Sequence, residues 1–113
     1  MNTRIFVLAI FALLLGSSGA FAAEGKVTII SVMPANIYAK DKITLNYEAV
    51  PGPEGDHLHL NVDGKRVDVI HELKGTAMVD PLPAGKHHIC LAVNTHAHVP
   101  TGVEGCVDVT VWQ

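Results

Sequence analysis

The stretch HLHLNVDGKRVDVI, residues 57–70, decides the fold of this chain. In HLHLNV (57–62) apolar and polar residues alternate, as they do when successive side chains of a strand point to opposite faces. The dipeptide Asp63-Gly64 favours a tight hairpin turn, and KRVDVI (65–70) is the returning strand. Because a hairpin with one apolar face must bury that face, residues 57–70 predict a layer of sheet packed against another layer.

The same strand chemistry recurs on both sides of this hairpin. Segments rich in β-branched residues alternate with Pro/Gly-rich turns, and no segment has a helical period. This pattern predicts an all-β fold, an immunoglobulin-like antiparallel β-sandwich of about seven strands. Besides 57–62 and 65–70, we expect strands within 26–34, 42–50, 75–93 (two strands around a Pro/Gly corner) and 106–112, with loops at 51–56 and 94–105.

The N-terminal residues have the character of a secretory signal peptide. Arg4 precedes an eleven-residue apolar run (5–15), and small residues follow up to Ala22. That run is too short for a bilayer-spanning helix, which needs about 20 residues. We therefore expect a signal peptide at 1–22 and a single β-sandwich domain at 23–113, periplasmic or secreted and without stable membrane insertion after cleavage.

The charge balance and the cysteine count narrow the class of protein further. Without residues 1–22 the chain has 7 basic and 11 acidic residues, a net charge of −4, with no basic cluster for nucleic acid. Its two cysteines, Cys90 and Cys106, are expected to pair in an oxidising compartment. Strand parity puts both on the outward face of neighbouring strands, which suits a cross-strand disulfide. The alternative is a pair of thiolates that bind a soft ion such as Cu(I).

Seven histidines occur in this short chain, and two pairs have the spacing His-x-His. His57 and His59 share one face of a strand, with side chains about 7 Å apart, so both rings can approach one ion. Imidazole suits Cu(II) and Zn(II) in an oxidising compartment. Asp56 and Glu72 are candidate ligands or hydrogen-bond partners of ligands. The candidate metal ligands are His57, His59, His71, His96 and His98.

Other functions find less support in the sequence. His87 falls on an apolar strand face, as hydrogen-bonded structural histidines do, and His88 points to solvent. No H-E-x-x-H motif or Gly-rich phosphate loop occurs, and the only serine after residue 22 is Ser31 in the first strand, so we expect no enzyme and no organic cofactor. A blue-copper site is disfavoured because no methionine follows Cys106.

Several motifs together resemble a family of small exported bacterial His-rich domains of unknown function. They are GDHLHLNVDG (55–64), VIHELKGTAMVDPLPAGKHHICLAV (69–93), HAHVPTG (96–102) and the terminal VDVTV (107–111). The resemblance spans residues 27–111 and implies an immunoglobulin-like sandwich that binds metal. It carries over to His57, His59, His71, His87 and His98. The chain departs from the family where Leu58 interrupts a run of histidines and where Thr101 replaces a histidine.

Two hypotheses of different class follow. In the first, the chain is a small exported protein that captures copper or zinc through its histidines. In the second, it is a non-catalytic structural or interaction module without a metal, and another exported protein docks on an edge strand. The two hypotheses differ in whether the ring nitrogens of His57, His59, His71 and His98 fall within ~5 Å of a common point; scattered rings would favour the interaction module.

Overall fold

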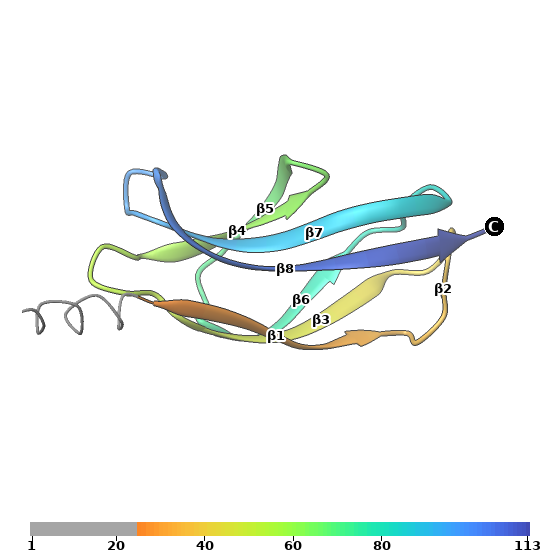
Figure 1. The fold of residues 1–113 in the computed structure, drawn as a ribbon, viewed down its shortest axis with the longest axis horizontal. Helices are drawn as coiled ribbons and strands as arrows, with labels where there is room; N and C mark the ends of the chain where they lie inside the picture. The colour runs from red at the N-terminus through yellow and green to blue at the C-terminus, as the bar shows by residue number, and fades with distance from the viewer. Residues whose placement is uncertain (1–24) are drawn as a thin grey trace, which may run out of the picture.

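A computed structural model describes residues 25–113, which form two packed β-sheets (Figure 1). The three-stranded sheet has the order β1-β3-β6, and the five-stranded sheet has the order β2-β8-β7-β4-β5. The predicted immunoglobulin-like sandwich is thereby confirmed, whereas the predicted signal peptide lies outside the described residues. The strands are β1 (Lys26–Met33), β2 (Ile37–Tyr38), β3 (Ile43–Val50), β4 (His57–Val62), β5 (Lys65–Ile70), β6 (Lys74–Val79), β7 (Gly85–Asn94) and β8 (Pro100–Trp112).

The core between the sheets follows the alternation seen in the sequence. On β4, Leu58 and Leu60 are 0 % and 1 % exposed, and they pair with Val93 and Leu91 of β7, both 0 % exposed. The facing sheet contributes Tyr47 of β3, a fully buried aromatic residue. Each such large apolar side chain stabilises the fold by about 2–5 kcal/mol relative to alanine. Burial of this face fixes the opposite, outer face of β4, which carries His57 and His59.

The loop predicted at 94–105 is much shorter in the structure. Strand β8 already begins at Pro100, and Asn94 pairs with Pro100, so the connection is only residues 95–99. The glycines that suggested a loop lie within the ladder: Gly102 has a positive φ of 96°, and the register shifts between Ala92 and Asn94. A glycine can adopt such a conformation without steric cost, so an irregular strand continues through it. Strand β2, which pairs in parallel with β8, was also not predicted.

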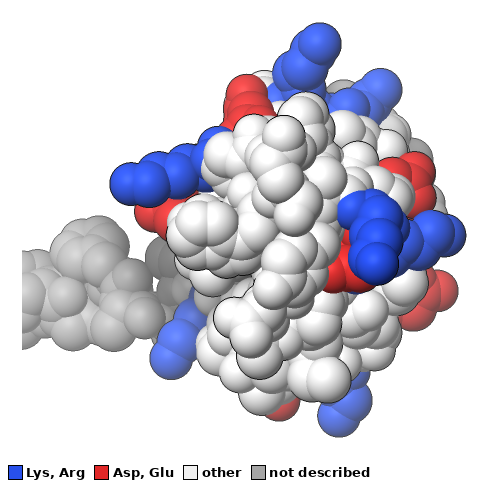
Figure 2. All heavy atoms as spheres, turned by 90° about the vertical axis from the view of Figure 1, so that its right-hand side faces the viewer, with Lys and Arg blue, Asp and Glu red and all other residues white. Residues whose placement is uncertain are grey.

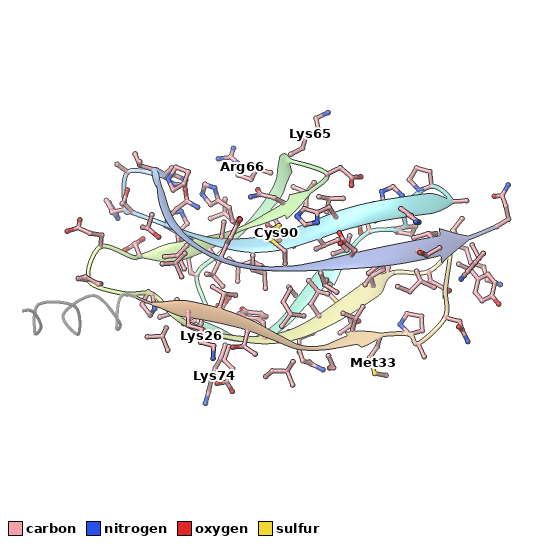
Figure 3. All side chains as sticks on the ribbon, viewed as in Figure 1. Lys26, Met33, Lys65, Arg66, Lys74 and Cys90 are labelled. Carbon is pink, nitrogen blue, oxygen red and sulfur yellow. A yellow bond between two sulfur atoms is a disulfide. The ribbon has the colours of Figure 1, made fainter. Side chains whose placement is uncertain are left out.

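A disulfide joins the two central strands of the larger sheet. Cys90 of β7 and Cys106 of β8 are direct cross-strand partners with Cα atoms 4.1 Å apart, which confirms the predicted pairing (Figure 3). Its position on the outer face is also as predicted, although Cys90 is only 7 % exposed. The bond closes the hairpin whose tip is residues 95–99.

Among residues 25–113 there is no helix with the length and apolar character needed to cross a membrane.

Candidate metal centre

Three histidines from two distant parts of the chain meet on the outer face of the five-stranded sheet. His57 and His59 project from β4, where their cross-strand partners in β7 are Asn94 and Ala92. The β7–β8 hairpin turns back at residues 95–99 and brings His98 over this pair (Figure 1). The covered pair is buried, with His57 1 % and His59 8 % exposed. His57 and His59 therefore do not form a solvent-exposed strand face.

The ring nitrogens of these histidines converge. Nε2 of His57 lies 3.1 Å from Nε2 of His59, which in turn lies 3.0 Å from Nδ1 of His98. Each residue offers one nitrogen, and the three nitrogens lie within 4.8 Å of one another. The ring centroids of His57 and His98 are 4.4 Å apart. These residues define the three-histidine cluster, whose donors can all reach one ion.

The distribution of protons and lone pairs over the ring nitrogens favours a cation between them. Nδ1 of His57 is 2.9 Å from Oδ2 of Asp56, so this nitrogen carries the proton and Nε2 presents a lone pair. Nε2 of His59 takes part in both close contacts, yet it either carries one proton or offers one lone pair. One proton cannot give two good hydrogen bonds there. A metal ion satisfies all three lone pairs at once.

Asp56 orients the ring of His57. Its backbone N–H donates to the carbonyl of Asn94, which fixes the 51–56 loop to the end of β7. Gly55 allows this close approach, since a Cβ there would meet the side chain of Val93. The hydrogen bond from His57 holds the pKa of Asp56 below its ordinary value. A carboxylate–histidine pair of this kind fixes the tautomer of a metal-binding imidazole.

The surroundings of His59 favour its neutral form. Burial lowers the pKa of the His59 imidazole, and positive charge on His57, Arg66 and His98 lowers it further. Arg66 lies on the neighbouring strand β5 (Figure 3). Only a neutral imidazole has a lone pair for a metal, so burial prepares His59 for coordination.

The backbone at His98 is unusual. Its φ is 65°, in the left-handed region that non-glycine residues seldom adopt. The tight turn holds it there: the N–H of His98 donates to the carbonyl of Thr95, and the N–H of Thr95 donates to the carbonyl of Val99. A histidine in this conformation costs about 1–2 kcal/mol relative to glycine. Such outliers cluster at functional sites.

The two remaining candidate ligands lie beside the cluster rather than in it. His71 follows β5, and its ring centroid is 5.3 Å from that of His57. With Asp56 and His57 it forms a second group whose ligand atoms lie within 4.8 Å of one another. His96 is almost fully exposed, and its Nδ1 lies 3.7 Å from Oδ2 of Asp56. Both therefore approach the Asp56 side of His57.

Two residues that the sequence did not single out support the site. Asn94, 1 % exposed and paired with His57, donates from its amide to the carbonyl of Ala92, while its Oδ1 has no hydrogen-bond partner among the described residues. Such an orphaned buried acceptor suits a water bound to an ion. The hydroxyl of Tyr47 donates to the carbonyl of Glu72 at 2.8 Å, which anchors the turn after His71 to β3. Burial, with the charge of Glu72 beside it, raises the pKa of Tyr47.

His87 and His88 lie away from the cluster. Nδ1 of His87 is 2.6 Å from Asp63 Oδ2, and its Nε2 is 2.7 Å from the carbonyl oxygen of Pro83, as expected for a structural histidine. His88 is exposed as expected, with Nδ1 2.6 Å from Asp108. These acidic partners raise the pKa of both histidines. His88 is therefore a useful control position.

Comparisons with known proteins identify the fold. No protein-family model matches the chain, and neither does any curated protein. Among solved structures, the chain is similar to one described as "Structures of Clostridium thermocellum CbhA fibronectin(III)-like modules". The TM-score is 0.61 at 15 % identity, covering 77 % of this chain and 97 % of that chain. The chain thus has the fibronectin III-like, immunoglobulin-like fold, and its intramolecular disulfide is of a kind typical of extracellular proteins.

Proposed function

We propose that this protein is a small periplasmic or secreted binding protein that captures one Cu(II) or Zn(II) ion with His57, His59 and His98. The observation that carries the proposal is the convergence of three ring nitrogens at 3.0 and 3.1 Å on the shared His59 Nε2. Three histidine ligands with an open fourth position are a common arrangement for zinc.

The nitrogen spacing supports both metals. Nitrogens about 2.0–2.1 Å from a tetrahedral ion lie about 3.3 Å apart, as zinc requires. Adjacent corners of a square around copper at ~2.0 Å lie about 2.8 Å apart. The observed 3.0 and 3.1 Å lie between these values, so small ring movements suit either ion.

The proposed mechanism is binding without turnover. Asp56, the carboxylate nearest the cluster, is already hydrogen-bonded to His57 and so orients a ligand instead of acting as a general base. The neutral rings coordinate the ion, and affinity falls below a pH of about 6, where imidazoles take up protons.

A metal titration tests the proposal. Tag-free protein corresponding to residues 23–113 is titrated with Cu(II) and with Zn(II) at neutral pH, against a competing chelator. We expect tight binding in the wild type, a loss of at least about 100-fold in His59→Ala, and an unchanged affinity in His88→Ala. Wild-type binding no tighter than that of a short His-x-His peptide would refute the proposal.

A second candidate function is that of a protein-interaction module. The observation that favours it lies at the end of the sandwich away from the three-histidine cluster. Figure 2 shows this end, next to the C-terminus, as a surface with a wide area free of Lys, Arg, Asp and Glu, bordered by charged side chains and by one charged group on the right of the face. Tyr38 and Trp112, which pair between β2 and β8, are 44 % and 56 % exposed. Another exported protein is the proposed partner for this surface. A Trp112→Ala variant that keeps metal affinity but loses a pulled-down partner would assign it that role.

A further inference from the structure

The central feature of the site is that the two ring nitrogens of His57 face different sets of donors. Nε2 faces His59, which contacts His98. Nδ1 faces the carboxylate of Asp56 at 2.9 Å. The ring of His57 itself is 1 % exposed, so it forms a buried partition between the two sets.

The second set contains enough donors for an ion of its own. Asp56, His57 and His71 each offer a ligand atom within 4.8 Å of the others, and Nδ1 of His96 lies 3.7 Å from Asp56 Oδ2. The ring of His71 contacts that of His57, with centroids 5.3 Å apart. His71 groups with Asp56 and His57, whereas the three-histidine cluster consists of His57, His59 and His98.

We propose that the site is dinuclear, with a second divalent transition-metal ion held by Asp56, His71 and Nδ1 of His57. The imidazole of His57 then bridges the two ions, and His96 is a further donor from solvent. This inference rests on the proposed function, because the bridge requires the first ion on Nε2. The ligands of the second ion, mixed nitrogen and carboxylate oxygen, suit Zn(II) and Cu(II).

The hydrogen bond between His57 Nδ1 and Asp56 Oδ2 has a length compatible with two ligands of one metal ion. The Nδ1 to Oδ2 distance of 2.9 Å is close to the ~2.8 Å between adjacent corners of a square around an ion at ~2.0 Å, and a small movement would widen it to the ~3.3 Å of a tetrahedral site. Asp56 and His71 are both exposed, so the second set opens to solvent while the ring between the ions stays buried.

The proposed bridge requires His57 to lose one proton. Neutral His57 carries one proton, on Nδ1, and coordination of the first ion at Nε2 leaves it in place. A cation on one nitrogen makes the remaining N–H more acidic. The second ion replaces this proton, which leaves for solvent, and the ring becomes an imidazolate that donates a lone pair to each ion. No electron transfer takes place.

Copper titration with electron paramagnetic resonance tests this bridge. Tag-free wild-type protein is titrated with Cu(II) at neutral pH while bound copper and the resonance intensity are both measured. We expect two copper ions per chain, with intensity that rises to one equivalent and then falls as the bridged ions couple. The His71→Ala variant should bind one ion, and its intensity should not fall. His88→Ala should behave as the wild type.

Each outcome separates the two proposals. Saturation at one ion, or two ions with additive and uncoupled signals, would overturn the bridge and leave the capture of one ion intact. No tight binding at all would overturn both. Two coupled ions in His71→Ala would also overturn the ligand set proposed here.

Discussion

Replacing His98 by asparagine separates metal binding from folding. Asparagine tolerates the left-handed backbone at this position at least as well as histidine, so it removes only part of the cost of about 1–2 kcal/mol relative to glycine. The lost contact with His59, 3.0 Å in the structure, offsets this by about 0.5–1.5 kcal/mol. We therefore expect the metal-free variant to match the wild type within about 1 kcal/mol in its free energy of unfolding.

The stabilisation by bound metal should differ sharply between the wild type and His98→Asn. An ion at 100 times its Kd stabilises the folded wild type by about 2.7 kcal/mol. For a domain of this size that corresponds to a Tm rise of roughly 10–20 °C. If losing one of three ligands weakens binding about 100-fold, the same ion concentration leaves only about 0.4 kcal/mol, a rise of about 2–3 °C.

Thermal unfolding of both proteins, with Zn(II) and then with excess chelator, measures this difference. The chelator should return the wild type to its metal-free Tm, and His88→Asn should retain the full metal-dependent rise. A full rise in His98→Asn would show that the 95–99 turn supplies no ligand and would refute the argument from nitrogen convergence.

Three further predictions concern the scaffold. Replacing Cys90 and Cys106 by serine opens a loop of about 15 residues and should lower the free energy of unfolding by about 3 kcal/mol, measured with urea. Tyr47→Phe removes the hydrogen bond to the part-buried carbonyl of Glu72 and should cost about 0.5–1.5 kcal/mol in the same assay. The hydrogen bond to Asp63 raises the pKa of His87, so its stabilisation is complete below the unfolded pKa of about 6.5 and is lost as pH rises through the folded value. The stability difference between wild type and His87→Gln should therefore shrink between pH ~6 and ~9; a constant difference would contradict the ion pair.

Local patterns were sufficient to predict much of the fold. The alternation in residues 57–62 placed Leu58 and Leu60 in the core and the two histidines opposite, because strand geometry leaves no other choice once one face is buried. The equal spacing of Cys90 and Cys106 about the hairpin predicted their pairing for the same reason. Parity is a local property, so a single sequence contains it.

The burial of the site depends on tertiary structure and was not predicted. His57 is 1 % exposed, with the rings of His98 and His71 beside it, and the 95–99 turn that carries His98 is short because β8 begins at Pro100. Glycines are typical of loops, so the sequence around Gly102 and Gly105 predicted a loop where β8 has already begun. The position of His71 likewise depends on the remote hydroxyl of Tyr47, which anchors the following residue. Sequence spacing alone could not distinguish one shared ion from donors on two sides of His57.

Strand β8 links the two ends of the molecule. It begins two residues after His98 and ends at Trp112, and its 13 residues span about 40 Å. A partner docked at the Trp112 end would leave the histidine end unobstructed. Such an arrangement would let the protein remain bound to a partner at one end while it exchanges ions with a third molecule at the other end.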